Sequence, residues 1–236
     1  MAFRRRLRRV FRRVCVLYLL VCLIGQGCAW LAPPRFTDSA TRPEAPVVQL
    51  RYATLPSLLR PVAVHASFAS YEPAEGRWRR WEVWQTRGGP FGHVRRDRAD
   101  VDSDIGGGPT WTAREWRGDE ARRLIAALER STNSYPNRDV YRIWPGPNCN
   151  TYAAWVLRRA GVAADLHPKA VGKDYLGWIG AHRTTTGTGV QVETPLIGAK
   201  LGLRDGVEIH LFCLTLGADA WPPAVKTPVG RIGFPE

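Results

Sequence analysis

Cysteine is scarce beyond the first 34 residues of the chain, and the common metal-binding spacings are missing. Only Cys149 and Cys213 occur in that part, so the sequence predicts no disulfide framework. It contains neither C-x-x-C nor H-E-x-x-H, and we therefore expect no metal site. The glycine run at 106–108 lacks the lysine and the strand–loop–helix context of a phosphate loop. These gaps argue against metal and nucleotide chemistry, and we expect no cofactor.

Basic residues outnumber acidic ones, but most of the excess lies at one end of the chain. The formal net charge is +13, and seven arginines among residues 1–13 supply more than half of it. Removing those seven charges leaves +6, which is ordinary for a domain of this size. We therefore expect no nucleic-acid partner. The remaining positive charge suits contact with anionic lipid headgroups.

The strongest pattern is this arginine cluster followed by an apolar run. Residues 14–32 are apolar, with Gln26 as the only strongly polar side chain. As a helix they span about 28 Å, close to the roughly 30 Å hydrocarbon core of a bilayer, and Pro33-Pro34 ends the helix. Arginine-rich flanks stay in the cytoplasm. We therefore predict a single-pass anchor in the bacterial inner membrane, with the globular domain on the periplasmic side.

Alternatives to an uncleaved anchor stay open. The most apolar part, residues 14–24, is short and is followed by small residues, as in a cleaved signal peptide. Cys28 is a candidate for lipidation, although Gly25 stands where such a signal has a Leu-like residue. Arg8-Arg9 resembles part of a twin-arginine export signal. Each alternative also places the domain outside the cytoplasm.

Beyond the anchor, the sequence predicts a linker over residues 33–47 and one α+β domain over residues 48–236. Alternating side chains predict an antiparallel meander with Gly88-Gly89-Pro90 as a turn, and its strands cover residues 61–69, 77–85 and 91–96. Apolar stripes predict two helices that pack on the sheet, one over 119–130 capped by Asp119 and one over 148–161. A later strand is predicted over 207–215, and it places Cys213 in the core.

Residues 144–152, Trp-Pro-Gly-Pro-Asn-Cys-Asn-Thr-Tyr, are the most informative stretch for function. They place Cys149 at the start of a helix, where free main-chain N–H groups and the helix dipole favour a thiolate. A thiolate is the form that attacks an acyl carbon. Asn148 and Asn150 add side-chain amides, which we interpret with the helix-start N–H groups as an oxyanion site. The alternative is a small buried cysteine with a packing role.

A thiolate nucleophile needs a base, and His65 is the best candidate. Small residues occupy the rest of its strand face, so a helix packed there would bring a thiol close: Ala63, Ser67 and Ala69. His93, on the third predicted strand, is a candidate to orient His65 or to act as the base itself. Both histidines also have structural interpretations, as packed or partly exposed strand residues. We interpret the remaining histidines as turn, surface or strand positions: His167, His182 and His210.

An Asn-Cys pair that opens a helix after a histidine-bearing strand resembles the circularly permuted branch of the NlpC/P60 papain-like superfamily, which includes lecithin retinol acyltransferase-like and PPPDE proteins. More closely, the chain resembles the bacterial family DUF3750, whose function is unknown. The resemblance implies a permuted papain-like fold, and it implies that serine often stands at the position of Cys149. The matching stretches span nearly the whole exported domain: residues 145–152, 170–174, 187–189, 206–208 and 223–231.

Together these patterns predict a cell-envelope Cys–His hydrolase or acyltransferase. In this hypothesis Cys149 attacks an amide or ester, His65 transfers the proton, and His93 or an asparagine orients His65. The compartment offers peptidoglycan peptides and lipid or other acyl groups as substrates. One alternative is a non-catalytic envelope module that binds a glycan, peptide or lipid through a tryptophan-lined cleft. Another is a scaffold for a membrane complex.

Overall fold

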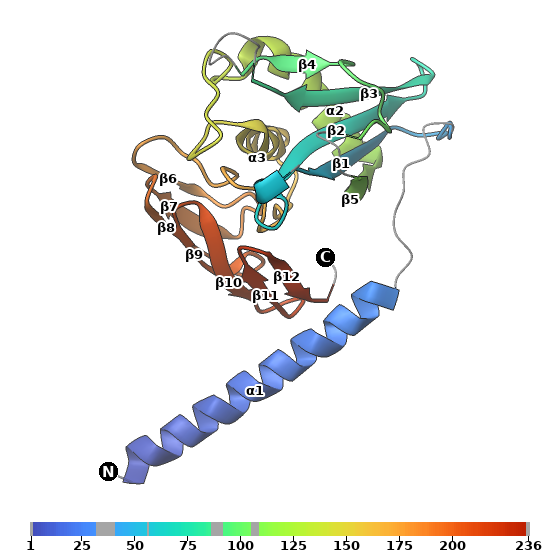
Figure 1. Ribbon diagram of the computed structural model, residues 1–236. Coiled ribbons are helices and arrows are strands. Elements are labelled where there is room, and N and C mark those ends of the chain that lie inside the picture. Colours follow the sequence, from blue (N-terminus) through green and yellow to red (C-terminus); the bar gives the residue numbers. More distant parts are fainter. Residues whose placement is uncertain (1, 32–40, 56, 86–91, 105–108, 235–236) are drawn as a thin grey trace.

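The computed structural model describes residues 2–31, 41–55, 57–85, 92–104 and 109–234 (Figure 1). One long N-terminal helix precedes a globular part with two antiparallel sheets and two further long helices. The predicted α+β class with antiparallel strands is therefore confirmed, although the single sheet that we expected is two. The turn predicted at 88–90, the glycine run at 106–108 and part of the predicted linker lie outside the described residues.

The first sheet has five strands in the order β4-β3-β2-β1-β5, and all neighbours are antiparallel. Two helices pack on one face of it, which carries Val64, Ala66 and Phe68 as the alternation predicts. Burial of this apolar cluster holds the sheet and the helices together. The elements are β1 (Val47–Thr54), η1 (Ser57–Leu59), β2 (Val64–Glu72), β3 (Arg77–Val83), β4 (Val94–Arg96), β5 (Thr110–Arg117), α2 (Gly118–Ser134) and α3 (Cys149–Ala160).

Both predicted helices form near their predicted positions. α3 follows Asn148 as N-cap and ends at Gly161, whose φ of 62° suits glycine at a helix C-terminus. α2 buries the predicted apolar stripe of Ala121, Leu124, Ile125 and Leu128. The predicted cap of α2 is wrong, because Arg117 occupies the N-cap position and Asp119 lies in the first turn. There its carboxylate still interacts favourably with the helix dipole.

The sequence pattern does not predict β1 and β5, although β1 lies inside the sheet. β1 follows a proline-rich segment and contains two buried polar residues, Gln49 and Arg51. Gln49 donates a hydrogen bond to Glu115 of β5 at 2.8 Å, and Arg51 donates one to the carbonyl oxygen of Val101. Buried polar groups are stable only when they are paired. These partners lie far away in the sequence, so the strand alone does not reveal its burial.

The second sheet is a seven-stranded meander in chain order. It overturns the single strand predicted over 207–215, because Phe212 and Cys213 form a two-residue turn with φ of 52° and 63°. Positive φ at both positions is typical of tight hairpin turns, so Cys213 is a half-buried turn residue and not a core strand residue. The strands are β6 (Gly180–Arg183), β7 (Gly189–Glu193), β8 (Ile197–Gly202), β9 (Gly206–Leu211), β10 (Leu214–Asp219), β11 (Ala224–Thr227) and β12 (Gly230–Gly233).

The second sheet turns its charged side chains inward. Glu208 of β9 lies at the centre, and its carboxylate contacts three ammonium groups at 2.6–3.2 Å, those of Lys173, Lys200 and Lys226. His210 is 1% exposed and lies 2.9 Å from Glu208, so it is a buried strand residue and not a surface one. We refer to the following residues as the ion network: Asp165, Lys173, Asp174, Glu193, Lys200, Glu208, His210, Asp219 and Lys226.

The N-terminal helix, α1 (Ala2–Leu31), is long and apolar enough over Arg4–Ala29 to cross a membrane. It packs against the β11–β12 end of the second sheet, and its N-terminal half projects away from the globular part (Figure 1). The Tyr18 hydroxyl donates a hydrogen bond to the carbonyl oxygen of Asp219 at 2.6 Å. Gln26 Oε1 accepts one from the Gly233 N–H at 3.3 Å. The helix therefore contacts the globular part through specific polar groups.

Candidate active site

Cys149 is the first residue of α3, and a capping box fixes the start of that helix. Asn148 Oδ1 accepts hydrogen bonds from the main-chain N–H groups of Asn150 at 2.9 Å and Thr151 at 3.2 Å. In return, Thr151 Oγ1 accepts one from the Asn148 N–H at 3.1 Å. This reciprocal arrangement satisfies donors that a helix start otherwise leaves free. The thiol, on a residue only 5% exposed, therefore occupies a firmly held position.

Asn150 joins this helix start to the edge of β2. β2 pairs with β3 only along its last five residues, so its first residues have no β3 neighbour. The Asn150 amide takes the place of the missing strand, because Nδ2 donates to the Val64 carbonyl at 3.0 Å and Oδ1 accepts from the Ala66 N–H at 3.2 Å. His65 lies between those two residues. The helix packs on the opposite face of β2 from the one we expected, and it reaches His65 around the strand edge.

The structure brings the Cys149 thiol and the His65 ring close enough together that each shifts the pKa of the other. Burial alone would raise the pKa of the thiol, but the His65 charge, the Ala66 N–H and the Tyr141 hydroxyl hold the pKa of Cys149 below its ordinary value. Burial opposes the charged ring as well, yet Cys149 and Glu82 raise the pKa of His65 from 6.5 to about 9. Both shifts favour a thiolate beside an imidazolium.

Glu82 of β3 is the third member of this site, and the sequence analysis missed it. Its Oε2 lies 3.2 Å from His65 Nε2 and 3.2 Å from Arg80 Nε, and all three residues are at most 2% exposed. Burial raises the pKa of the Glu82 carboxyl, but the hydrogen bond with His65 and the charge of Arg80 outweigh it and lower that pKa. The Trp84 ring stacks on the His65 ring at a centroid distance of 4.5 Å. Glu82 and Trp84 thus fix the orientation of the imidazole.

The sequence does contain a signal for Glu82. In β3, Arg80 and Glu82 alternate with Trp81 and Val83, which both belong to the apolar core. The two charged side chains therefore lie on the other face of the sheet. The register places Arg80 opposite Ala69 of β2, which shares its face with His65. An acid and a base on one face of neighbouring strands are within reach of each other.

His93 stands directly before β4 and is half-buried. The side chain that hydrogen-bonds the His65 ring is Glu82, and Cys149 and Glu82 are the groups that raise the pKa of His65. Glu82 thus occupies the orienting position that we predicted for His93 or an asparagine. A catalytic role for His93 stays a prediction.

Asn148 and Asn150 support the site through the main chain. Asn148 Nδ2 donates to the carbonyl oxygens of Ile143 and Val171, both at 3.0 Å. Asn150 Nδ2 donates to those of Val64 at 3.0 Å and Val171 at 2.9 Å. Since each amide has only two N–H hydrogens, neither side chain has one left for an oxyanion in this conformation. The predicted oxyanion role fits these amides poorly, and the main-chain N–H of Cys149 at the helix start is a better candidate.

The segment 170–174 completes the support of the helix start. Besides the two bonds to Val171, the Gly172 carbonyl accepts a hydrogen bond from Thr151 Oγ1 at 2.6 Å. Gly172 has a φ of 86°, and a Cβ there would lie 2.4 Å from the amide nitrogen of Asn148. A larger residue would displace the cap, so only glycine suits this position. Lys173 and Asp174 come next, and Lys173 Nζ lies 2.5 Å from Asp174 Oδ2. Both residues belong to the ion network.

Two groups of side chains have spacings that a metal ion could use. Asp174, Glu208 and His210 place ligand atoms within 4.8 Å of one another. The Lys173 ammonium already contacts both carboxylates and supplies the positive charge that a cation would bring. The other group lies at the surface and consists of Glu72, Glu75 and Glu129. Carboxylates alone at a surface do not define a metal site.

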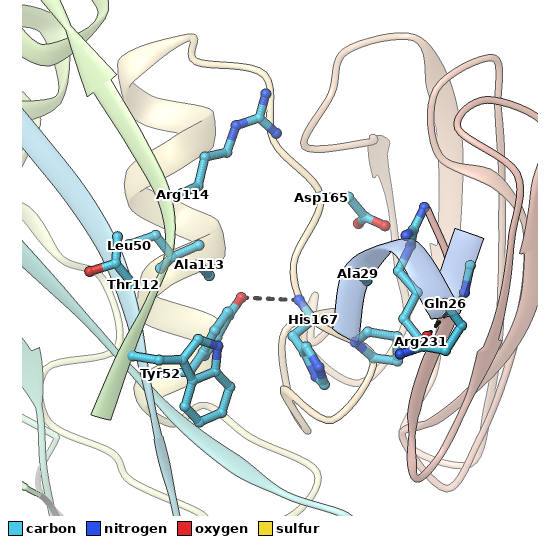
Figure 2. Close-up of a pocket in the computed structure, with 13 residues that line it drawn as sticks. Gln26, Ala29, Leu50, Tyr52, Thr112, Ala113, Arg114, Asp165, His167 and Arg231 are labelled. Atoms are coloured by element: carbon cyan, nitrogen blue, oxygen red, sulfur yellow. Dashed lines mark hydrogen bonds between the residues drawn. The ribbon is translucent and has the colours of Figure 1, made fainter. Parts of the chain in front are cut away.

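A separate pocket of about 430 Å³ opens between the first sheet, the second sheet and α1 (Figure 2). Tyr52 lines one side, and Gln26 and Arg231 lie on the other. Trp111 also lines the pocket, and its ring centroid lies 5.8 Å from that of Tyr52. The His167 main-chain N–H donates to the Tyr52 hydroxyl at 3.0 Å. Burial and nearby cations lower the pKa of His167 to about 4, so its ring is neutral at pH 7. The residues that line this pocket are distinct from those of the thiol site.

The fold and the site define an α+β protein with a buried cysteine–histidine–glutamate arrangement at a helix start. A sequence profile of the family described as "Protein of unknown function (DUF3750)" matches residues 45–175. This is more than half of the chain, so the chain belongs to that family and the resemblance is confirmed. The match is shorter than expected and ends before the second sheet, which leaves the stretches at 187–189, 206–208 and 223–231 beyond it. No curated protein and no solved structure matches the chain.

Proposed function

We propose that the protein is a membrane-anchored thiol hydrolase or acyltransferase of the cell envelope, with Cys149 as the nucleophile. The observation that carries the proposal is the buried contact of Cys149 with His65, whose ring is held by Glu82. The chain offers its own contrast, because burial raises the pKa of the Cys213 thiol to about 11. The pKa of Cys149 is shifted the other way despite its burial, as a nucleophilic thiol requires.

The resting site stores the thiol proton of Cys149 on His65. The thiolate sulfur bonds to the carbonyl carbon of an amide or ester and forms a tetrahedral intermediate. As the bond to the amine or alkoxide breaks, His65 donates its proton to that leaving group. Water or an acceptor alcohol or amine then attacks the thioester and gives its proton to His65. The carbon–sulfur bond breaks, the product leaves, and the thiolate–imidazolium pair is restored. Water gives hydrolysis, and another acceptor gives acyl transfer.

The oxyanion of the intermediate lies next to the helix start. The cap occupies the N–H groups of Asn150 and Thr151, so the Cys149 main-chain N–H, which donates to the Tyr141 hydroxyl before substrate binds, is the first candidate donor. The second is the Tyr141 hydroxyl, which donates a hydrogen bond to the Cys149 sulfur at 3.9 Å. Burial and Cys149 raise the pKa of Tyr141, so its hydroxyl keeps its proton and can donate it to an oxyanion.

The order of the residues along the chain supports a permuted papain-like arrangement. A strand histidine comes first, an orienting carboxylate second, and a helix-start cysteine third: His65, Glu82 and Cys149. The arginine cluster before the apolar run supports an inner-membrane anchor with the domain on the periplasmic side. Peptidoglycan peptides and lipid-borne acyl groups are the amides and esters within reach there.

A binding module without catalysis is the second candidate, and the pocket in Figure 2 favours it. The rings of Tyr52 and Trp111 suit a sugar or an acyl chain. This candidate predicts that Cys149→Ala preserves function and that Trp111→Ala removes ligand binding. Catalysis predicts instead that Cys149→Ala abolishes function and leaves the melting temperature close to that of the wild type.

The test of catalysis is the rate at which iodoacetamide alkylates Cys149 in the full-length protein, measured against pH by peptide mass spectrometry. We expect fast labelling with an apparent pKa well below the usual value of about 8.5. In His65→Ala the apparent pKa should return toward that value. Cys213 serves as the internal control and should label slowly. If Cys149 labels as slowly as Cys213 and is indifferent to His65, it is a structural residue and the proposal fails.

A further inference from the structure

The outward face of the second sheet is apolar. Its strands β7 to β10 carry eight aliphatic side chains that are each 41–62% exposed: Val190, Val192, Ile197, Leu201, Val207, Ile209, Leu211 and Leu216. We refer to these eight residues as the apolar face. The strand register sets them side by side, with Leu201 opposite both Val190 and Val207. Contiguous apolar patches on a protein surface mark places where something else binds.

The sheet is inverted relative to the sheet of a water-soluble domain, since the ion network fills its inner side and aliphatic residues cover its outer side. Along β9, for example, Glu208 and His210 are buried while Val207 and Ile209 are exposed. This polar-in, apolar-out alternation is what β-structure shows where its outer surface meets acyl chains. A protein partner would suit the same pattern, so the choice between the two rests on the neighbouring helix.

The contacts of α1 place the edge of this sheet at membrane depth. Among the described residues they fall inside the apolar run of residues 14–32, at Tyr18, Cys22 and Gln26. A strand held against that part of a membrane-crossing helix lies among lipids as well. Gln26 Oε1 accepts a hydrogen bond from the N–H of Gly233 on the edge strand β12. That N–H would otherwise be unsatisfied in a bilayer, where water is absent.

Gly25 shows that α1 and β12 are shaped for close contact. A Cβ at Gly25 would lie 2.5 Å from the main-chain nitrogen of Phe234, whereas a Cβ at Gly27 would meet nothing within 4 Å. Glycine is thus required on the side of the helix that faces the sheet. The helix and the strand are therefore closely packed at Gly25, where the helix has no side chain.

We propose that the apolar face is seated in the bilayer that α1 crosses and contacts its acyl chains. This inference rests on the membrane anchor of the proposed function. Trp178, before β6, and Trp221, between β10 and β11, are 76% and 79% exposed. Exposed tryptophans beside an apolar surface are typical of the zone between acyl chains and water.

The position of the apolar face in the bilayer has a consequence for the substrate, because the second sheet contacts the loop that leads to Cys149. Trp144 Nε1 donates a hydrogen bond to the Phe212 carbonyl at 2.9 Å, and Cys213 Sγ lies 3.7 Å from the Pro145 carbonyl oxygen. The β9–β10 turn therefore positions that loop. A thiol that follows a loop held by a membrane-seated sheet is close to acyl groups borne by lipids or lipid-modified proteins. Among the substrates considered above, these are favoured over peptidoglycan peptides.

The test is photo-cross-linking of the full-length protein in vesicles of phosphatidylethanolamine and phosphatidylglycerol. The photoreactive residue p-benzoylphenylalanine replaces Val192 or Ile209 in the apolar face. In α1 it replaces Leu20 as the positive control, and on the exposed surface of α2 it replaces Glu129 as the negative control. We expect lipid adducts at Val192 and Ile209 severalfold above those at Glu129. We expect each variant to fold, because all four positions have substantially exposed or surface side chains. Melting curves check this.

Each other outcome contradicts the proposed lipid contact of the apolar face in a different way. Lipid adducts at Leu20 with only background levels of adduct at Val192 and Ile209 would support the anchor and refute the lipid contact of the apolar face. Background levels of adduct at Leu20 as well would refute both the anchor and the lipid contact. A cross-linked protein band at Ile209, from another protein or a second copy, would assign the apolar face to a protein interface. None of these results depends on the reactivity of Cys149, so the catalytic proposal fails or stands separately.

Discussion

The two sheets of this protein bury charge for different purposes. The first sheet packs an apolar face against α2 and α3, and its buried charges lie on the other face, where Arg80 and Glu82 hold a histidine beside a thiol. The second sheet fills its inner side with lysines and carboxylates that bind one another. A buried charge indicates chemistry where a nucleophile belongs to the network, and it indicates cohesion where the partners only neutralise each other. Variants in each sheet can break this distinction.

Glu208→Gln should have the largest effect. It leaves the ammonium groups of Lys173, Lys200 and Lys226 without their central counter-charge. Breaking a buried ion pair by removing one partner costs about 3–5 kcal/mol, and urea unfolding measures the loss. Asp139→Asn, which removes an exposed pair with Arg138, is the control and should leave the unfolding curve unchanged. If Glu208→Gln unfolds like the wild type, the ion network does not hold the second sheet together.

The pH dependence of stability should come from the second sheet. Burial lowers the pKa of the His210 ring, but Asp174, Glu193 and Glu208 raise it to about 9. The folded pKa therefore lies above the unfolded value near 6.5. His210 stabilises the fold fully below about pH 6.5, and its contribution, on the order of 3 kcal/mol, is lost as pH rises through about 9. The pKa of His65 is also raised, but its ring holds the proton that Cys149 releases, so the pair binds one proton in both the folded and the unfolded chain between about pH 6.5 and 8.5.

Urea unfolding between about pH 6 and pH 10 tests this. The unfolding free energy of the wild type should fall over that range, and His210→Gln should make the fall shallower. His65→Gln is the matched control and should not make the fall shallower, because the His65–Cys149 pair binds one proton in both states over most of the range. If His210→Gln keeps the slope of the wild type, His210 is not charged in the folded state.

Glu82→Gln should change reactivity in the first sheet alone. Without the carboxylate the pKa of His65 falls, and the thiolate of Cys149 loses part of its counter-charge. A change of one pKa unit alters the thiolate fraction about tenfold, so we expect alkylation of Cys149 near neutral pH to slow by about that factor. Glu75→Gln, at an exposed pair with Arg79, is the matched control. Equal rates in the two variants would exclude Glu82 from the site.

Gly25→Leu should have the smallest effect and should be confined to the second sheet. The new side chain cannot fit against Phe234, so α1 separates from β12, while the apolar character of the helix is kept. Amide hydrogen exchange in β11 and β12 should then speed up severalfold. Gly27→Leu has the same effect on helix propensity and hydropathy but faces open space, and it should leave exchange unchanged. Identical exchange in the two variants would contradict the observed packing.

Local signals in the sequence predict much of the first sheet and the helix start. The Asn148 cap, the apolar stripe and Gly161 all lie within one short segment, and they define α3 and the place of Cys149. The alternation in β2 separates His65 from the core face. The link between the two is less visible, because Asn150 bonds to β2 across more than 80 residues. Glu82 could be expected from β3, but only once its register with β2 is known.

The second sheet shows that the alternation of polar and apolar residues does not tell which face of a strand is buried. A period of two divides a strand into two faces, and it does not say which of them is inside. In β9 the aliphatic set of Val207, Ile209 and Leu211 looks like a core face, yet it is exposed. Only the ion pairs of Glu208 with distant lysines reveal the inner side. The two-residue turn at Phe212 and Cys213 is hidden as well, because neither residue is glycine, asparagine or aspartate.

The Asn150 amide that replaces a strand beside His65 also determines when the thiol becomes reactive. Residues 65, 82 and 149 come from two strands and a helix, and the His65 ring and the Ala66 N–H, which lower the pKa of Cys149, lie more than 80 residues before it in the chain. Until the sheet is paired and the helix start is clamped to its edge, the thiol is an ordinary cysteine and is largely protonated at neutral pH. The low pKa of the thiol, on which the proposed nucleophile depends, is therefore acquired only in the last steps of folding.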